Sequence, residues 1–479
     1  MENKREKAKR IQNIYPLTPL QEGMLFHYLE DSQTTAYVLQ DCYSVNTELS
    51  EDLIVKVLDL LATKHDALRT SIMYEKLKEP MQVVLKERKL EFTTESLSDL
   101  SEEEQLNRVD EIINKDLERG FDLQKDTLVR LKYIKLNNKS KLLWSMHHII
   151  VDGWCTGMIT GGFIEYYNML KAGKDYNKLK AEIIEQRKYT SEYSDYIKWI
   201  QKQDKRQGMN YWKELLDGYD NVADIPAMME SDNVDGGIEN ATILIEGDTK
   251  KRIENIVKEE SLTMSVVAET VFGLLISQYT SEKDVVFGKV VSGRNADIAG
   301  IENIVGLFVN TIPVRVEFDD DTTIRELLKK QHNQNIDSTS YGFMSLADIQ
   351  SQTSQGSNLI KIIYAFQNFS SGSDEPIEEV QDKGIKFVLE NAREEAHYAL
   401  SLKGFYTNGV LGFNFMYNSK EFCEKEIQHL EEVVKKICNE IALNPDKKVK
   451  QIDMITPEER KLVLETFNDT DVAYPKDKT

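Results

Sequence analysis

The heptad HHIIVDG at residues 147–153 brings two histidines and an aspartate close together in the chain, and such side chains can bind and transfer protons. If the residues before it form a strand, successive side chains point to opposite faces, so His147 and His148 cannot both enter one cavity. Asp152 lies where the chain must turn, and its side chain could cap a helix that begins near Trp154. A histidine at such a strand end is suited to general acid–base catalysis.

The residues alone allow two other interpretations of the heptad. In the first, His147 and His148 are polar residues of a buried strand and Asp152 is only a helix cap, which fits a pattern as short as HxxxD equally well. In the second, the three side chains ligate zinc or iron, but ligands on opposite faces of a strand seldom converge. The chain has seven histidines and no HExxH or Cys/His cluster to complete such a site, so we expect no bound metal.

The elements that must position the heptad can be predicted from the spacing of apolar residues. Strands are expected at 128–136 and 141–150, joined by a turn at Asn137-Asn138, and an apolar helix follows at 154–171. The other elements predicted in this half are a helix that starts with the capping box Thr18 to Gln21 and with Pro19 in its first turn, a helix near 51–65, the strand-like LRTSIMY at 68–74, and a helix that starts with the capping box Ser101 to Glu104.

The second half of the chain alternates helices and strands in the same way. A polar, Tyr-rich stretch from Lys171 to about Asp204 precedes it, and we expect this stretch to connect two lobes. Helices interleaved with strands in both halves predict a mixed α/β (α+β) fold with two lobes on related plans. The elements predicted here are a helix at 263–279, a strand at 284–291, a helix near 323–335, a strand at 359–369, a hairpin of 397–405 and 410–418 about Thr407-Asn408-Gly409, and a long helix at 424–443.

Length and charge limit the classes of function. At 479 residues the chain exceeds the roughly 250–300 residues that one hydrophobic core usually supports. Its 60 basic and 81 acidic side chains give a net charge of -21, which would repel phosphate backbones, so we expect no nucleic-acid partner. The content of 41% hydrophobic and 29% charged residues is typical of a globular chain that can bury a core.

The sequence favours a cytoplasmic protein. The basic start MENKREKAKR is not followed by the apolar segment of a signal peptide, and no run of about 18 uncharged apolar residues could cross a membrane. The four cysteines are scattered without a CxxC pair, which fits reduced thiols better than a disulfide framework or a zinc site: Cys42, Cys155, Cys423 and Cys438.

The heptad matches the HHxxxDG signature of the condensation domains of non-ribosomal peptide synthetases and of the wider HxxxD acyltransferases that act on thioesters. Six other segments resemble motifs of that family and come in the family's order: YPLTPLQEGMLFH at 15–27, KHDALRTSI at 64–72, YWKELLDG at 211–218, FGKVVSGRN at 287–295, IVGLFVNTIPVRV at 304–316 and SLADIQ at 345–350. The resemblance covers essentially residues 14–457.

This resemblance implies a fold of two chloramphenicol acetyltransferase-like lobes that form a V-shaped pseudodimer with a central tunnel. It implies amide-bond formation between a donor aminoacyl or peptidyl thioester and the α-amino group of an acceptor aminoacyl thioester. Both substrates would be carried on phosphopantetheine arms of carrier proteins, and the domain itself would bind no cofactor. The segments HHIIVDGWC and TPLQEGMLFH also resemble members that accept a D-configured donor.

Site residues follow from the same resemblance. His148 matches the functional histidine, and the Gly153 amide is expected near the reacting carbonyl. His147 and Asp152 match supporting positions, and we expect Arg294, in the segment SGRN, to pair with Asp152. Two more residues could line the tunnel, although packing is the alternative for each: Trp154 and Asn310.

The ends of the chain resemble linkers within a synthetase. We expect residues 1–13 to follow an upstream carrier protein, 14–175 and 176–457 to form the two lobes, and 458–479 to lead toward an adenylation domain. The implied partners are an upstream donor carrier, a downstream acceptor carrier and the adjoining adenylation domain. The excised domain is expected to be a monomer.

Other functions are compatible with parts of this pattern. An epimerization domain shares the fold and the heptad, but typically continues into a different segment containing Ser and Trp, where this chain has DGWCTG. A heterocyclization domain replaces the histidine pair with aspartate. A silent interaction module would be expected to have lost the heptad, and a free-standing acyl-CoA transferase is disfavoured by the adenylation-type linker.

Overall fold

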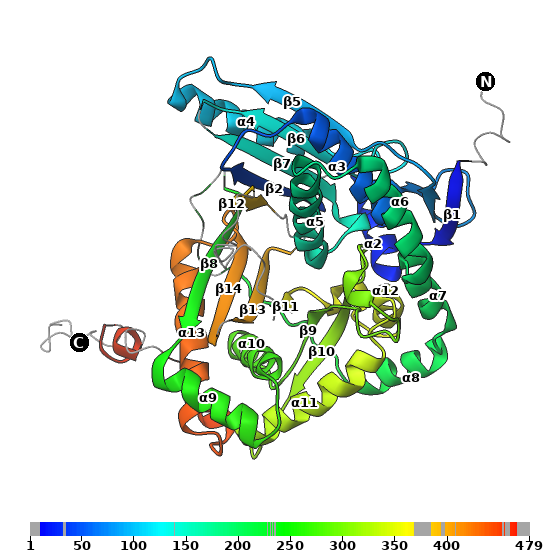
Figure 1. The fold of residues 1–479 in the computed structure, drawn as a ribbon. Helices are drawn as coiled ribbons and strands as arrows, with labels where there is room; N and C mark the ends of the chain where they lie inside the picture. Colours follow the sequence, from blue (N-terminus) through cyan, green and yellow to red (C-terminus); the bar gives the residue numbers. More distant parts are fainter. Residues whose placement is uncertain are drawn as a thin grey trace, which may run out of the picture.

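The protein is seen in a computed structural model that describes residues 10–31, 35–137, 139–227, 229, 231, 233, 236–367, 385–393, 398–407, 409–452, 455 and 460–466. Helices and strands are mixed, and two lobes, each with its own large sheet, lie one above the other in Figure 1. The mixed α/β architecture predicted from the sequence is therefore confirmed.

The upper lobe in Figure 1 contains a five-stranded sheet in the order β12-β2-β7-β6-β5 and a small sheet in the order β1-β4-β3. Its central strand, β7, is antiparallel to both neighbours, whereas β5 and β6 are parallel. The helices and strands from this half of the chain are β1 (Ile11–Pro16), α2 (Pro19–Glu30), β2 (Val38–Val45), α3 (Glu51–Lys64), β3 (Thr70–Met73), β4 (Met81–Leu85), β5 (Glu91–Ser96), α4 (Glu102–Arg119), β6 (Val129–Lys135), β7 (Ser140–His147) and α5 (Gly153–Lys171). Both predicted capping boxes, at the starts of α2 and α4, are present.

The stretch from Lys171 to about Asp204, which we expected to connect the lobes, is largely helical. It contains α6 (Tyr176–Gln186) and α7 (Tyr193–Lys202), and α8 (Lys205–Leu215) follows it. Leu179 and Ile183 of α6 are buried in the core of the upper lobe, where α6 packs on α3. The stretch is polar overall, but its apolar residues recur at helical spacing.

The lower lobe in Figure 1 contains a six-stranded sheet in the order β10-β9-β11-β13-β14-β8. Most neighbours are antiparallel, but β11 is parallel to both β9 and β13. Its helices and strands are β8 (Ile238–Ile245), α9 (Gly247–Glu259), α10 (Met264–Thr280), β9 (Asp284–Val291), β10 (Asn310–Glu317), α11 (Ile324–Ser340), α12 (Leu346–Gln350), β11 (Ile363–Gln367), β13 (Leu400–Thr407), β14 (Val410–Asn418) and α13 (Glu424–Leu443).

The predicted hairpin and the strand predicted at 359–369 both lie in this lobe. The predicted hairpin is formed by β13 and β14, with Thr407 opposite Val410, although His397 and Asn408 lie outside the described residues. The strand predicted at 359–369 begins only at Ile363, because residues 356–359 form a short 3-10 helix, and residues 368 and 369 lie outside the description.

One strand crosses between the halves of the chain. β12 (Phe387–Arg393) pairs antiparallel with β2, so that Phe387 lies opposite Val45. An ion pair between Glu390 and Lys141 of β7 and a 2.6 Å hydrogen bond from Arg393 to Asn114 of α4 add contacts. A strand from the second half thus covers what would be an open edge of the first sheet, which removes a row of unpaired backbone groups.

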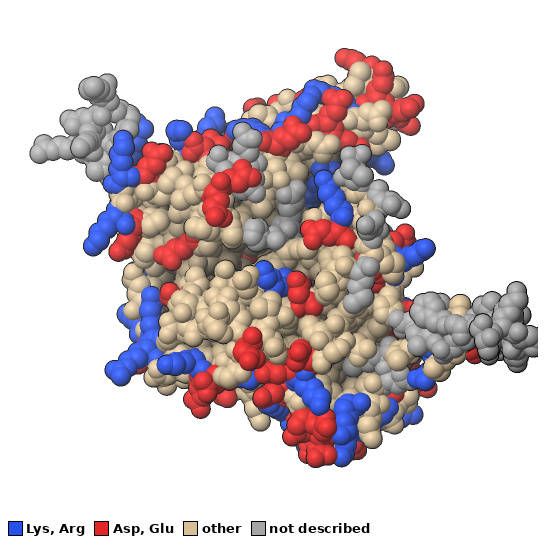
Figure 2. Space-filling model, turned by 180° about the vertical axis from the view of Figure 1, so that it is seen from behind, with Lys and Arg blue, Asp and Glu red and all other residues tan. Residues whose placement is uncertain are grey.

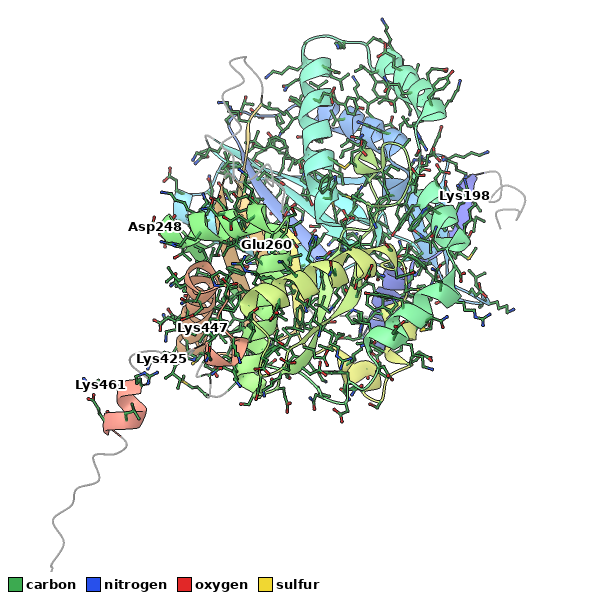
Figure 3. All side chains as sticks on the ribbon, turned by 90° about the horizontal axis from the view of Figure 1, so that it is seen from below. Lys198, Asp248, Glu260, Lys425, Lys447 and Lys461 are labelled. Carbon is green, nitrogen blue, oxygen red and sulfur yellow. The ribbon has the colours of Figure 1, made fainter. Side chains whose placement is uncertain are left out.

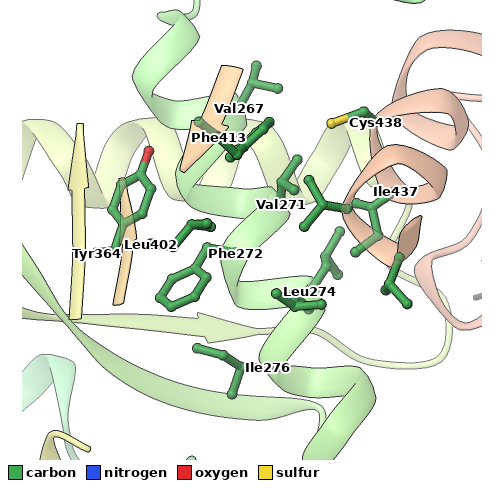
Figure 4. Close-up of a cluster of buried hydrophobic side chains, with 14 of the residues drawn as sticks. Val267, Val271, Phe272, Leu274, Ile276, Tyr364, Leu402, Phe413, Ile437 and Cys438 are labelled. Atoms are coloured by element: carbon green, nitrogen blue, oxygen red, sulfur yellow. The ribbon is translucent and has the colours of Figure 1, made fainter. Parts of the chain in front are cut away.

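The core of the lower lobe is organised around α10, which is apolar on nearly every side. Figure 4 shows side chains of this helix, among them Val271 and Phe272, between strand residues such as Tyr364 and Phe413 and the helix α13, which contributes Ile437 and Cys438. Burial of one such Val, Leu, Ile or Phe side chain contributes about 1.5–3 kcal/mol.

The surface carries charges of both signs. In the view from behind, acidic and basic side chains are intermixed, and the surface is hollowed between the two lobes (Figure 2). In the lower lobe, Glu260 at the end of α9 pairs with Lys329 of α11 at 2.6 Å, and Lys447 pairs with Glu440 of α13 at 3.0 Å; Glu260 and Lys447 are labelled in Figure 3. The short π-helix at 462–466, beside Lys461, lies apart from the body.

No single helix within the described ranges is long and apolar enough to cross a membrane. Among the residues described, only α9 and α10 taken together pass that test of length and composition, and they are bent by 115° at the break between them.

Candidate active site

The heptad begins at the end of the central strand of the upper lobe. β7 ends at His147, and His148–Ile150 form a turn of 3-10 helix, the His148 turn, before α5 starts at Gly153. The prediction that the strand runs on to residue 150 is therefore wrong, and His148 does not belong to the alternation of the strand. The His148 N–H still donates to Tyr37 O at 2.7 Å, which extends the pairing with β2 by one residue, and the chain leaves the sheet in the turn that follows.

His147 lies inside the protein and supports the His148 turn. Its Nδ1 accepts a hydrogen bond of 3.1 Å from Ile149 N, and its ring packs edge-on against Phe121, with 6.1 Å between the ring centroids. Burial, with a further contribution from the nearby His148, lowers the pKa of His147 to about 3. The ring is therefore neutral at physiological pH, and its acceptor nitrogen is committed to the backbone.

His148 is less buried than His147 and lies between two helices. Its turn contacts α2, and α5 begins after two further residues. The side chain of Gln21 in α2 donates to Ile149 O at 2.7 Å, which links the segment at 15–27 to the heptad. Of the two histidines, His148 is therefore partly accessible and His147 is buried.

Asp152 occupies the N-cap position of α5, but its side chain does not cap the helix. The predicted capping bond is therefore wrong. The carboxylate instead lies between Arg294, with 3.2 and 3.3 Å from Nη2 to its two oxygens, and the N–H of Phe308, at 3.1 Å. Because Asp152 is only 1% exposed, these contacts with the lower lobe hold it in place.

Arg294 comes from the loop between β9 and β10 and reaches the upper lobe. Its Nη1 donates to Ile301 O at 2.8 Å and to Ile304 O at 2.9 Å, so the guanidinium also shapes its own loop. Gly293 has a φ of +65°, and a Cβ there would lie 1.9 Å from Phe308 O. Glycine is therefore required for the chain to present Arg294 in this way.

The start of α5 offers backbone donors to open space. Gly153 is the first residue of the helix, and its N–H is one of the four at a helix start that have no partner within the helix. A Cβ on Gly153 would meet no atom within 4 Å. An N–H here, at the positive end of the helix dipole, can stabilise negative charge that develops on a carbonyl oxygen.

Trp154 and Asn310 are both engaged in contacts within the protein. Trp154 Nε1 donates to Glu302 O at 3.0 Å, and its ring lies 5.6 Å from the guanidinium carbon of Arg294. Asn310 is buried and donates to Gly342 O at 2.8 Å and Met344 O at 2.7 Å. Each has a packing role, and a tunnel-lining role for either stays a prediction.

Several supporting residues were not found from the sequence. The Cys155 thiol lies 3.1 Å from Asp152 Oδ1 and 3.2 Å from Gly306 O. Tyr196 of α7 donates to Phe308 O at 3.2 Å. The sequence predicted Gln21 only as part of a capping box. Gln21 lies inside a segment that resembled a family motif and Cys155 directly follows the heptad, whereas no motif pointed to Tyr196.

A pocket of about 360 Å³ lies apart from the heptad. It is lined by residues 64–66, 183, 186–187, 189–193, 299–300 and 303–305, and no heptad residue contributes to it. Within the part of the chain that the structure describes, no group of three or more His, Cys, Asp and Glu residues could hold a metal ion.

Comparison with known proteins identifies the family. A model described as "Condensation domain" matches residues 11–464. The chain is 34% identical to Bacitracin synthase 3 of Bacillus licheniformis over 475 residues, which are 98% of this chain and 7% of that protein. It is 34% identical to Tyrocidine synthase 3 of Brevibacillus parabrevis over 479 residues, which are 99% of this chain and 7% of that protein. The chain thus spans less than a tenth of the length of these curated relatives.

Solved structures show the same fold. The chain resembles a four-domain nonribosomal peptide synthetase bound to AMP and glycine with a TM-score of 0.74 and 16% identity, over 93% of this chain and 34% of that one. It resembles the starter condensation domain of the rhizomide synthetase RzmA with a TM-score of 0.68 and 14% identity, over 93% and 100% of the two chains. With the family model matched over nearly its whole length, this chain belongs to the condensation domain family.

Proposed function

We propose that the chain forms an amide bond between two thioester-bound substrates. The α-amino group of an acceptor aminoacyl thioester attacks the carbonyl of a donor aminoacyl or peptidyl thioester, and the donor thiol leaves. The observation that carries this proposal is the intact heptad, with His148 in a fixed turn beside the exposed start of α5, in a chain that matches the family over residues 11–464.

The contacts suggest a division of roles among the heptad residues. His148 orients the acceptor amine and takes a proton as the tetrahedral intermediate forms, while the Gly153 N–H lies near the reacting carbonyl. His147 holds the His148 turn through Ile149 N, and the pair of Asp152 and Arg294 holds the start of α5 against the lower lobe. Trp154 and Asn310 stay candidates for the lining of a tunnel between the lobes.

Positioning should supply most of the rate. An α-amino group with a pKa near 8 is neutral in roughly one molecule in ten at pH 7, so no strongly held proton must be removed before attack. Correct placement of two reactants can lower a barrier by about 7–11 kcal/mol, whereas a general base gives about 10²–10⁴-fold in rate.

The proposed partners are two carrier proteins and an adenylation domain. Each substrate would arrive on the phosphopantetheine arm of a carrier protein, one upstream and one downstream, with an adenylation domain beyond residues 458–479. Residues 1–13 would link to the upstream carrier, and 14–175 and 176–457 would form the lobes of a monomer. Cys42, Cys155 and Cys438, all buried and free, fit the cytoplasm.

A coupling assay tests the proposal. Donor carriers loaded with D- or L-residues are mixed with acceptor carriers loaded with each of the 20 standard amino acids, and dipeptidyl-carrier is detected by mass spectrometry. We expect product from at least one combination and none without enzyme. A racemised residue on a single loaded carrier, without coupling to any acceptor, would instead indicate an epimerization domain.

A further inference from the structure

Gln21 is a polar side chain with no exposed surface, and its amide makes every hydrogen bond that an amide can make. Its Nε2 donates to Ile149 O at 2.7 Å and to Gln82 Oε1 at 3.0 Å. Its Oε1 accepts from Thr18 N and from Gln82 Nε2, both at 2.8 Å. One side chain thus joins the start of α2, strand β4 and the His148 turn.

The direction in which the Gln21 amide points is fixed by its neighbours. Thr18 N can only donate, so the amide oxygen must face it, and the amide nitrogen then faces Ile149 O. Gln82, itself 2% exposed, is oriented in the same manner because its Nε2 also donates to Pro16 O at 3.0 Å. The two amides form a closed pair whose alternative orientations would each leave buried groups unsatisfied.

The carbonyl that receives this bond lies one residue after His148. Two other hydrogen bonds hold the His148 turn. The His148 N–H donates to Tyr37 O, just before β2, and the Ile149 N–H donates to His147 Nδ1. The Gln21 side chain, from helix α2, holds the carbonyl of Ile149, the middle residue of the turn. Since a misplacement of about 1 Å can lower a rate roughly 10²-fold, the orientation of the Ile149 peptide matters for His148.

We propose that Gln21 is a positioning residue for His148, set in its orientation by Thr18 and Gln82. It acts through the Ile149 carbonyl and has no contact with substrate. The consequence for rate rests on the proposed amide-forming function, whereas the consequence for the His148 environment does not.

Two substitutions separate this role from simple packing. Gln21→Glu keeps the shape and the acceptor for Thr18 N, but it places an oxygen against Ile149 O. Gln21→Leu removes both bonds. Gln331→Leu is the matched control, because Gln331 is also fully buried and donates to a backbone carbonyl, Arg315 O at 3.0 Å, but lies on α11 in the other lobe.

The environment of His148 is read from histidine side-chain NMR signals of ¹⁵N-histidine-labelled protein, with the His148 signal assigned by its loss in His148→Ala. Both Gln21 variants are expected to move this signal and to lower kcat at least 10-fold, with KM for the two carriers within twofold. Gln331→Leu, which removes one hydrogen bond where Gln21→Leu removes four, is expected to lower Tm less and to leave the signal and kcat unchanged.

Folded Gln21 variants with an unmoved His148 signal and an unchanged kcat would overturn the proposal, as would an equal signal shift in Gln331→Leu. If a Gln21 variant does not fold, Gln82→Leu provides the second test, because it removes the partner that orients the Gln21 amide. If the signal moves but the parent protein couples no substrates, the proposed function fails and the positioning role stands.

Discussion

Loss of either partner of the Asp152–Arg294 pair should destabilise the protein, and by different amounts. Asp152→Ala leaves a guanidinium that is 7% exposed without its carboxylate and leaves the Phe308 N–H without an acceptor. Removing one partner of a buried ion pair costs about 3–5 kcal/mol, and we expect this variant at about 5. Arg294→Ala should cost about 3 kcal/mol, because Asp152 keeps its bonds from Phe308 N and Cys155 Sγ.

The double variant distinguishes pairing from independent contributions. It removes the lone buried charge that each single variant leaves, so its loss should fall short of the sum by about 2 kcal/mol. At about 2.1 cal/mol/K per residue, the entropy of unfolding is about 1 kcal/mol/K for a chain of this length. Asp152→Ala should therefore lower Tm by about 5 °C and Arg294→Ala by about 3 °C.

Urea unfolding of the four proteins measures the coupling directly. Because the pair is buried, the coupling should change little between low and moderate salt. Additivity of the two single variants within about 0.5 kcal/mol would refute the view that this ion pair joins the lobes.

Three further outcomes are expected. Gly153→Ala should fold with unchanged Tm, because the added Cβ enters open space, but its kcat should fall at least 10-fold. Unchanged coupling by this variant would show that Gly153 does not lie at the reacting centre. His147 has a pKa of about 3 in the folded protein and near 6.5 when unfolded, so the unfolded state binds the extra proton and stability falls as pH drops from 6.5 toward 3. His147→Asn, whose side-chain oxygen can replace Nδ1 as acceptor for Ile149 N, should remove about 1.4 kcal/mol per pH unit from this slope between pH 6 and 4, and parallel stability curves for the two proteins would contradict the burial of a neutral imidazole. Trp154→Phe should cost about 1 kcal/mol of stability through the lost bond to Glu302 O and leave coupling within threefold, whereas a tenfold rise in KM would instead place the indole against substrate.

Local patterns in the sequence were enough for much of the fold. The capping boxes at Thr18 and Ser101, the strand β9 and the helix α5 each depend on residues near one another in the chain, and each appears within a few residues of its predicted bounds. Contacts between distant residues were not visible. The pairing of β12 with β2 depends on the open edge of a sheet some 340 residues earlier in the chain, as the 340-residue separation of the Lys386 and Asn46 hydrogen bond shows.

The same distinction applies to the site. The types and order of the heptad residues were read from the sequence, but their local structure is set by tertiary contacts. Gln21 and His147 bind the Ile149 backbone in the turn that follows β7. Arg294 and Phe308 turn the Asp152 carboxylate away from the cap that its position suggested.

The central claim is that His148 serves the coupling reaction from a turn that other residues hold in place. Its most direct test is the initial rate of dipeptidyl-carrier formation by His148→Ala, measured with the productive donor and acceptor carriers of the parent protein and with Tm recorded alongside. We expect the rate to fall by about 10²–10⁴-fold while Tm stays unchanged. Full coupling activity in a folded His148→Ala protein would contradict the account.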